Sequence, residues 1–291
     1  MARHALKVLN QLREYDSFLN SLHTIVDMGC GTGEDITWWA TLETRDDPPV
    51  PYNYKCFAID QDATKLAQIP SLTNIHSFNR TFDEMCIPIQ VDLIWAHDSL
   101  QYSINPINTL KLWNAQMNVN GMLILSIPQH SGITDDTYYS RTHSGCYYNF
   151  TVTNLIYMLA VNGFDCNDAY VLKEFNDPWI HIAVYKSTVD PMDPATTSWS
   201  DLIKLNLLNP SVVKSIEQHG YLRQEDIEYP WLDKQTHRIE CVNQIVDNPS
   251  EVTNTYDGII RIVKSTVVPI IKQGNMVKKE TGVILQEKTT L

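Results

Sequence analysis

The stretch that decides the fold reads Ile25-Val26-Asp27-Met28-Gly29-Cys30-Gly31-Thr32-Gly33-Glu34-Asp35. A short apolar run ends on an acid, a glycine-rich turn follows, and a helical pattern begins near Ile36. Glycine accepts a positive φ and lets a ligand approach the bare backbone. The pattern therefore predicts a parallel strand whose carboxyl end opens into a tight loop under a helix N-terminus.

The spacing of the glycines separates two classes of cofactor. A dinucleotide fingerprint has the spacing G-x-G-x-x-G and leaves the positive helix end to a pyrophosphate. Here the spacing is G-x-G-x-G, and Glu34 and Asp35 stand at the helix start, where they complement the helix dipole. These carboxylates would repel a pyrophosphate but are compatible with a cofactor that carries an ammonium and a sulfonium. The segment resembles motif I of the class I S-adenosylmethionine (SAM) methyltransferases.

Composition and charge restrict the function further. The chain has 291 residues, of which 43% are hydrophobic, and a formal net charge of −12. No apolar run approaches the about 18 residues of a membrane-spanning helix, and Met1 to Asn20 reads as an amphipathic helix rather than a signal peptide. The acidic charge argues against a general nucleic-acid binder. The six cysteines include no C-x-x-C pair, which predicts no zinc site and reduced thiols in a cytoplasmic protein.

Further strands follow in the order that a doubly wound fold requires. Lys55 to Ile59 reads as a second strand that leads into Asp60. An acid at this place binds ribose hydroxyls in such folds, because a carboxylate accepts both hydrogen bonds. The later predicted elements are helix Ala63 to Ile69, strand Asn74 to Phe78, strand Val91 to Ala96, helix Thr109 to Met117, strand Asn120 to Pro128, a helix from Phe150-Thr151 to Gly163-Phe164, and the strands Tyr170 to Phe175 and Trp179 to Tyr185.

The resemblance to the methyltransferases covers about residues 20 to 187. It implies an α/β fold with a Rossmann-like seven-stranded, mostly parallel sheet and helices on both faces, and the residues beyond it are expected to form a C-terminal extension. Residues 1–187 then form the SAM-binding domain, and residues 188–291 form a lid over the acceptor side or an oligomerisation segment. The loop from Gln129 to Asn149 is rich in Tyr and His and is the second part of the expected lid.

The same resemblance implies SAM as the cofactor and S-adenosylhomocysteine as its product. Phe82 and Asp83 follow the third strand, where family members clamp the adenine. The residues expected to bind the cofactor are Asp27, Gly29, Cys30, Gly31, Gly33, Asp60, Gln61, Phe82, Asp83, Ala96 and His97.

The segment after the fourth strand is expected to face the acceptor. His97 to Pro106 resembles the corresponding segment of small-molecule methyltransferases, which commonly carries Leu-Glu-His where this chain has Leu100-Gln101-Tyr102. The candidate catalytic residues are His97, Tyr102 and His143, with His130 as a further basic group, and no metal site is expected. The chain lacks the (Asn/Asp/Ser)-Pro-Pro-aromatic motif of methyltransferases that act on base amino groups, and it lacks a Pro-Cys nucleophile.

Several functions remain open from the sequence. The first is methyl transfer from SAM to a small molecule, with a protein side chain as the second acceptor class, without nucleic acid or membrane and with a homodimer as one possible state. The second is a catalytically silent SAM-binding scaffold whose C-terminal third binds a partner. The third, a nucleotide-dependent oxidoreductase, is disfavoured by the glycine spacing and by Glu34 and Asp35.

Overall fold

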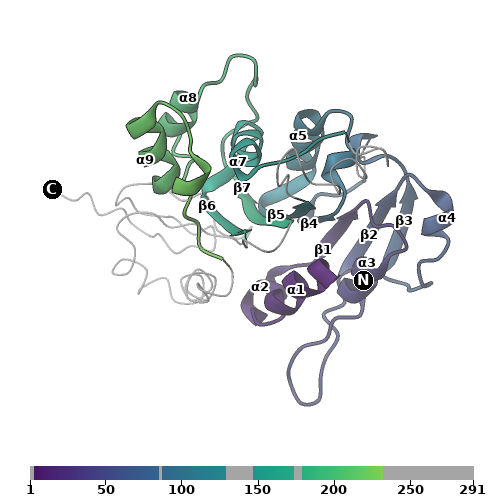
Figure 1. Cartoon of the computed structure of the whole chain (residues 1–291). Coiled ribbons are helices and arrows are strands. Elements are labelled where there is room, and N and C mark those ends of the chain that lie inside the picture. Colours follow the sequence, from purple (N-terminus) through teal and green to yellow (C-terminus); the bar gives the residue numbers. More distant parts are fainter. Residues whose placement is uncertain (1–2, 85–86, 129–146, 174–178, 232–291) are drawn as a thin grey trace, which may run out of the picture.

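The protein is described by a computed structural model over residues 3–84, 87–128, 147–173 and 179–231 (Figure 1). Seven strands form one sheet in the order β3-β2-β1-β4-β5-β7-β6. β1 to β5 run parallel to one another, and β7 lies antiparallel between β5 and β6. The predicted seven-stranded, mostly parallel α/β sheet is confirmed. The strands are β1 (Thr24–Met28), β2 (Lys55–Asp60), β3 (Ile75–Asn79), β4 (Val91–His97), β5 (Met117–Pro128), β6 (Phe164–Lys173) and β7 (Trp179–Lys186).

Helices cover both faces of the sheet (Figure 1). α1, α2 and α3 pack on one face, and α5 and α7 pack on the other. Within the described ranges, none of the helices has the length and apolar character needed to cross a membrane. The helices are α1 (Arg3–Leu12), α2 (Asp16–Ser21), α3 (Glu34–Ala40), α4 (Ala63–Leu66), α5 (Pro106–Gln116), α7 (Val152–Val161), α8 (Trp199–Lys204) and α9 (Pro210–His219), with 3₁₀ turns η1 (Phe82–Glu84), η2 (Leu100–Tyr102) and η3 (Gln224–Asp226).

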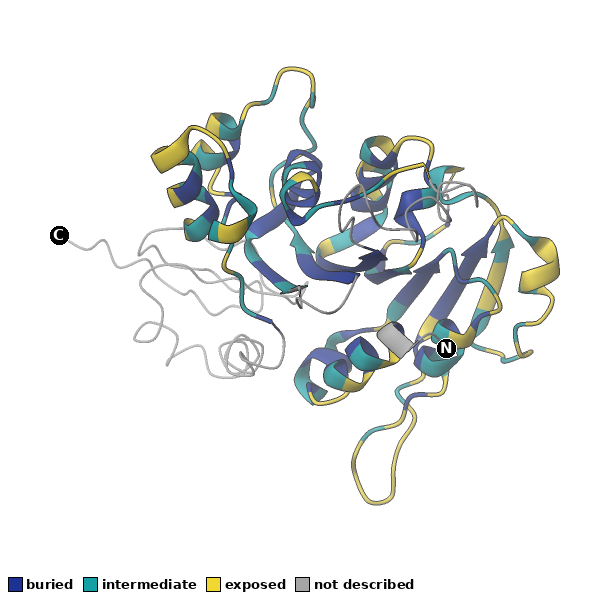
Figure 2. Cartoon of the chain, viewed as in Figure 1, coloured by how far each residue is buried: buried dark blue, intermediate teal, exposed yellow. Residues whose placement is uncertain are grey.

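Alternation along the strands sends side chains into two cores, one on each face. In β1, Ile25 packs in the core that contains α1, α2 and α3, whereas Val26 and Met28 pack in the core that contains α5 and α7. The central strands are accordingly buried on both sides, as expected for a parallel sheet (Figure 2). By the same period of two, Asp27 points toward the face of α3. We call the two clusters the α3-side core and the α5-side core.

Several predicted elements have different limits in the structure, among them α5, which is Pro106–Gln116, and β5, which begins at Met117. The helix expected over Ala63 to Ile69 ends at Leu66, and turns connect it to Pro70. The sixth strand begins at Phe164 rather than at Tyr170, and a register shift lies between its two paired parts. A bulge of this kind hides the alternation by which a strand is recognised.

The N-terminal segment forms two helices where one amphipathic helix was expected. Leu9 and Leu12 of α1 and Leu19 of α2 are buried in the α3-side core. Leu6, which belongs to the same leucine pattern, is 41% exposed. The predicted packing of this segment on the domain is confirmed, but its division into α1 and α2 was not predicted.

Residues 188–231 continue the fold beyond β7. α8 and α9 carry buried apolar side chains into the α5-side core, among them Leu202 and Val212. The Tyr229 hydroxyl donates to the Cys166 carbonyl at 2.8 Å, and the Trp231 indole N–H donates to Gln11 Oε1 at 2.8 Å. The domain boundary after residue 187 and the lid remain predictions, since residues 129–146 and 232–291 lie outside the described residues.

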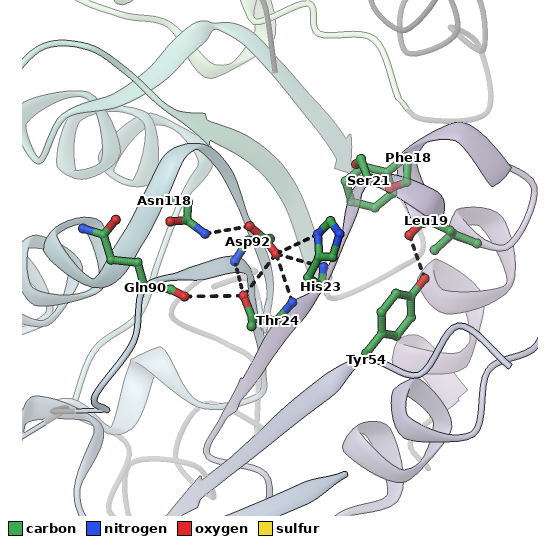
Figure 3. Close-up of polar contacts among 9 residues, drawn as sticks. All are labelled: Phe18, Leu19, Ser21, His23, Thr24, Tyr54, Gln90, Asp92 and Asn118. Carbon is green, nitrogen blue, oxygen red and sulfur yellow. Dashed lines mark hydrogen bonds and ion pairs between the residues drawn. The ribbon is translucent and has the colours of Figure 1, made fainter. Parts of the chain in front are cut away.

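At the amino edge of the sheet, Asp92 ties three strands together (Figure 3). Its Oδ2 accepts hydrogen bonds from the backbone N–H groups of His23 and Thr24 at 2.8 and 2.9 Å, and from Thr24 Oγ1 at 3.1 Å. Its Oδ1 accepts a hydrogen bond from Asn118 Nδ2 at 2.7 Å. The carboxylate therefore fixes the starts of β1, β4 and β5 relative to one another.

Candidate functional site

The glycine turn joins β1 to α3 at the carboxyl edge of the sheet. Its three glycines are in the left-handed region, with φ of 74° at Gly29, 55° at Gly31 and 80° at Gly33. The backbone N–H groups of Gly29 and Cys30 donate to the carbonyl of Ile59, near the end of β2, at 2.8 and 3.0 Å. Because a side chain at positive φ is strained, this turn requires glycine. The predicted strand, turn and helix are confirmed.

The surroundings of the three glycines differ. A Cβ atom added at Gly29 would lie 2.6 Å from the Cβ atom of Ser99, and one added at Gly33 would lie 2.5 Å from Cγ1 of Ile69. A Cβ atom at Gly31 would meet no described atom within 4 Å. Gly29 and Gly33 are therefore required by packing inside the protein, whereas Gly31 presents bare backbone to open space.

Asp60, the last residue of β2, holds the middle of this turn. It is 8% exposed, and its Oδ2 accepts a hydrogen bond from the Gly31 N–H at 2.8 Å. Its Oδ1 accepts one from the Asp62 N–H, also at 2.8 Å. A carboxylate has about four lone-pair sites, so each oxygen keeps capacity for a ligand hydroxyl. Asp60 thus lies beside Gly31, and its role in ribose binding stays a prediction.

Two buried acids flank the glycine turn in the sequence. Asp27 is 2% exposed, and Asp35, in the first turn of α3, has a side chain that is 12% exposed. Burial raises the pKa of Asp27 well above its ordinary range, and repulsion by Asp35 raises it further. Burial also raises the pKa of Asp35, while a hydrogen bond from Trp95 opposes that rise. Asp27 Oδ2 has no hydrogen-bond partner among the described residues.

Glu34 and Asp35 were both expected to complement the dipole of α3, but only Glu34 has the exposed position that this role requires. Glu34 is exposed, as a dipole-complementing acid is expected to be. Asp35 instead turns inward, and its Oδ2 accepts the Trp95 indole N–H at 3.0 Å. Desolvated carboxyl groups that repel each other, as those of Asp27 and Asp35 do, are stabilised by a cation. The acidic side of the turn is therefore suited to positive charge on a ligand.

His97 ends β4 and lies against these groups. Its Nδ1 is 3.7 Å from Asp35 Oδ2. Its ring stacks on that of Trp179, at the start of β7, with the centroids 5.1 Å apart. The sequence named His97 as a candidate but gave no sign of Trp179, because the two residues meet only across the sheet.

Phe82 and Asp83, the candidates for the adenine, make contacts with α5 and the segment before it. Asp83 Oδ1 accepts hydrogen bonds from the hydroxyls of Ser103, at 2.8 Å, and Thr109. The Phe82 ring packs edge-on against Trp113, with the centroids 6.4 Å apart. These contacts fix the segment after β3 to α5. A role in adenine binding stays a prediction for both residues.

The other cofactor candidates differ in exposure. Cys30 is 9% exposed, and burial raises the pKa of its thiol. The side chain of Ala96 is buried in the α5-side core, so a cofactor would contact its backbone rather than its side chain. Gln61 is exposed.

The turn after β4 brings further polar groups to the carboxyl edge. Tyr102 is half-buried in η2, and Ser99, which the sequence did not single out, abuts Gly29. Ser99 Oγ and Gln101 Oε1 are buried and have no hydrogen-bond partner among the described residues. The candidates His130 and His143 lie outside the described residues. In the ranges that the structure describes, no three His, Cys, Asp or Glu side chains are grouped as metal ligands.

Comparison with known proteins finds similarity at the level of structure alone. No protein-family model matches the sequence, and no curated protein matches it. Similar solved structures include an O-methyltransferase of a trans-AT PKS multienzyme from Brevibacillus brevis in complex with S-adenosylhomocysteine, which is 14% identical with a TM-score of 0.47, over 74% of this chain and 83% of the other.

Two more similar structures are the YcgJ protein from Bacillus subtilis and the plantazolicin methyltransferase BpumL. The first is 11% identical with a TM-score of 0.49, over 65% of this chain and 100% of the other. The second, in complex with S-adenosylhomocysteine and a desmethylPZN analog, is 11% identical with a TM-score of 0.45, over 61% of this chain and 85% of the other. Similarity this remote does not decide what the chain binds, which has to follow from its own geometry.

Proposed function

We propose that this protein binds SAM at the glycine turn and transfers its methyl group to a small-molecule acceptor. The observation that carries the proposal is the contrast among the glycines. Gly29 and Gly33 are packed against protein atoms, whereas Gly31 faces open space beside the carboxylate of Asp60. A backbone left bare in this way next to a hydrogen-bonding acid fits a ligand that lies on the turn.

The charge of the site favours SAM over a dinucleotide. Asp27 is buried and Asp35 is largely buried, both are close in the sequence to Gly31, and burial raises the pKa of each. SAM carries an ammonium and a sulfonium, which would compensate these acids. A pyrophosphate would add negative charge at the same place.

The chain's contribution to methyl transfer is binding and orientation. SAM, when bound, supplies an electrophilic methyl group on its sulfonium. Gly31 leaves space for the ligand, and Asp60 offers its free lone pairs to the ribose hydroxyls. In this proposal His97, the last residue of β4, and the residues that follow it up to Tyr102 orient an acceptor for in-line attack, and orientation of this kind supplies a large part of the rate enhancement.

A small molecule is the acceptor class that the sequence favours. The segment after β4 reads Ala96-His97-Asp98-Ser99, without the paired prolines that brace the amino group of a nucleic-acid base. The formal net charge of −12 disfavours a polyphosphate substrate.

Substitution of Gly31 tests the proposal, and Gly220 provides a matched control. Both glycines have a positive φ, 55° and 75°, and a Cβ atom at either would meet no described atom within 4 Å. Gly31→Val and Gly220→Val should therefore both fold, with a similar loss of stability of roughly 1–2 kcal/mol from backbone strain. Calorimetric titration with S-adenosylhomocysteine should show binding by the wild type and Gly220→Val but not by Gly31→Val.

Two results would contradict the proposal. One is a folded Gly31→Val protein that binds S-adenosylhomocysteine as tightly as the wild type does. The other is a wild type that binds NAD and neither SAM nor S-adenosylhomocysteine, which would support an oxidoreductase.

A further inference from the structure

Three large apolar side chains are exposed beside the turn that follows β4. Ile104, Tyr147 and Tyr148 are 72%, 63% and 38% exposed. Ile104 lies in the segment that connects β4 to α5, and therefore at the carboxyl edge of the sheet, where parallel sheets bind ligands. Tyr147 and Tyr148 are the first described residues after the gap at 129–146. We call these three side chains the apolar shelf.

Hydrogen bonds hold the shelf in place on this turn. The carbonyl of Gln101 accepts the backbone N–H groups of Tyr147 and Tyr148 at 2.9 and 3.2 Å. The Tyr148 hydroxyl donates to the Ile104 carbonyl at 3.0 Å, and the Tyr148 ring stacks on that of the buried Phe150, with the centroids 6.3 Å apart. The two tyrosines are thus fixed to the turn that carries Ile104. A ligand would meet a surface that needs little ordering, which favours binding.

The same turn connects the shelf to the glycine turn. It begins at Ser99, whose Cβ atom would lie 2.6 Å from a Cβ atom added at Gly29. Ile104 follows Ser99 by five residues. The shelf and the proposed cofactor site therefore belong to one region of the carboxyl edge.

The segments that carry the shelf are uncharged, although the protein is acidic. No Asp, Glu, Lys, Arg or His occurs from Ser99 to Leu110 or from Tyr147 to Phe164, whereas the formal net charge of the chain is −12. Asp83, which contacts the first of these segments, already accepts hydrogen bonds from the hydroxyls of Ser103 and Thr109. An uncharged surface of aromatic and aliphatic side chains favours a neutral, apolar ligand.

The size of the shelf favours a small ligand over a protein partner. A specific interface between proteins buries about 800 Å² on each partner and involves about 20 residues a side. Three side chains are too few for a second copy of this chain, whereas they match an aromatic ring or a short alkyl chain. Two other apolar side chains, Val119 near the start of β5 and Tyr221 after α9, are exposed to a similar degree but belong to neither segment of the shelf.

We propose that the apolar shelf binds the non-reacting apolar part of a neutral acceptor, and that Ile104 and Tyr147 are specificity-determining residues for it. This inference rests on the proposed function and names its acceptor class, which is an uncharged aromatic or alkyl compound rather than a phosphorylated or carboxylated metabolite. Binding energy from this part of the acceptor holds the reacting atom in line with the methyl group of SAM.

Equilibrium dialysis of a probe against the protein saturated with S-adenosylhomocysteine tests the proposal without the natural acceptor. The probe is 2-naphthol, with phenol as a smaller neutral ring and 6-hydroxy-2-naphthoate as a charged analogue. The wild type should bind 2-naphthol roughly tenfold more tightly than phenol, because the second ring buries more apolar surface. It should also bind 2-naphthol more tightly than the naphthoate.

Exposed side chains elsewhere provide matched controls. Ile104→Ser has its control in Val119→Ser, since the two side chains are 72% and 70% exposed. Tyr147→Ser has its control in Tyr221→Ser, at 63% and 61%. Each shelf variant should weaken 2-naphthol binding by roughly fivefold, whereas the controls should bind as the wild type does. Thermal unfolding with and without S-adenosylhomocysteine should show that all four variants fold and keep the cofactor.

The outcomes are distinguishable. The proposal is overturned if the wild type does not bind 2-naphthol, if the shelf variants bind it as the wild type does, or if the controls lose as much. A wild type that binds phenol or the naphthoate as tightly as 2-naphthol contradicts the neutral, apolar acceptor class. A wild-type dimer that dissociates in Ile104→Ser, measured by sedimentation velocity, would make the shelf an interface between copies instead.

Failure of the proposed function is a separate result. A wild type that does not bind S-adenosylhomocysteine contradicts the proposed function itself. Dialysis of 2-naphthol against the protein without cofactor, with the same variants, then still tests the shelf.

Discussion

Asp92 lies near the start of β4 at the amino edge of the sheet, and Asp27 lies near the end of β1 toward its carboxyl edge. Asp92 accepts hydrogen bonds from two backbone N–H groups, from the Thr24 hydroxyl and from Asn118 (Figure 3). Asp27 is more deeply buried, and its Oδ2 has no partner among the described residues. The same side chain is thus satisfied by the protein at one edge and left short of a partner at the other.

The difference between Asp92 and Asp27 shows that the two carboxyl groups contribute to the stability of the fold in opposite directions. A carboxylate that is fully hydrogen-bonded stabilises the native state, whereas one that is buried with an oxygen left unpaired costs free energy. The raised pKa values of Asp27 and Asp35 report that cost. Under the proposed function, a ligand that carries positive charge offsets this cost when it binds at the glycine turn.

The largest effect on stability is expected at the amino edge. Asp92→Ala removes an acceptor shared by β1, β4 and β5, and we expect a loss of about 3 kcal/mol in the free energy of unfolding. Urea unfolding followed by circular dichroism measures it. Asp62→Ala, which removes only a helix cap from α4, should cost about 1 kcal/mol. Equal losses in the two variants would contradict the structural role given to Asp92.

The next effect is expected on binding at the carboxyl edge. Asp60→Ala should weaken S-adenosylhomocysteine by about 2 kcal/mol, or roughly 30-fold, because charge-assisted hydrogen bonds to the ribose are lost and the Gly31 N–H loses its acceptor. Calorimetric titration measures the change. Asp62→Ala is again the control and should bind normally. Wild-type affinity in Asp60→Ala would show that the ribose lies elsewhere.

The smallest effect is expected on the pH dependence of stability, when Asp27 at the carboxyl edge is substituted. Since the folded-state pKa of Asp27 is raised, its contribution to stability is greatest below its ordinary pKa and is lost as the pH rises through the raised value. Asp27→Asn removes that loss, so near pH 7 the unliganded variant should be as stable as the wild type or more stable by about 1 kcal/mol. Its advantage should vanish in acid.

Thermal unfolding of both proteins between about pH 4 and 8, without ligand, gives this comparison. S-adenosylhomocysteine should then stabilise the wild type more than Asp27→Asn. A variant that is less stable than the wild type at every pH would mean that Asp27 is satisfied in the native state, as Asp92 is.

Local sequence patterns predicted the strands in their succession along the chain and the place of the glycine turn. Glycines at alternate positions after an apolar run specify positive φ without reference to the rest of the chain, and they do so here. The acid that closes β2 was also predicted, because parallel strands end at one edge. The bulged β6 and the division into α1 and α2 were missed, since a bulge and a helix break leave little trace in hydrophobic periodicity.

Only the tertiary structure decided which residues of the carboxyl edge lie in contact with one another. The sequence treated its three glycines alike, and the packing of Ser99 and Ile69 distinguishes Gly31 from the other two. It placed Asp35 as an acid that complements the helix dipole, whereas the fold turns that carboxyl group toward Trp95 and His97. Such contacts join strands and helices that are distant in the chain. They are set by sheet register and by the depth at which α3 packs, and neither is encoded in any single local pattern.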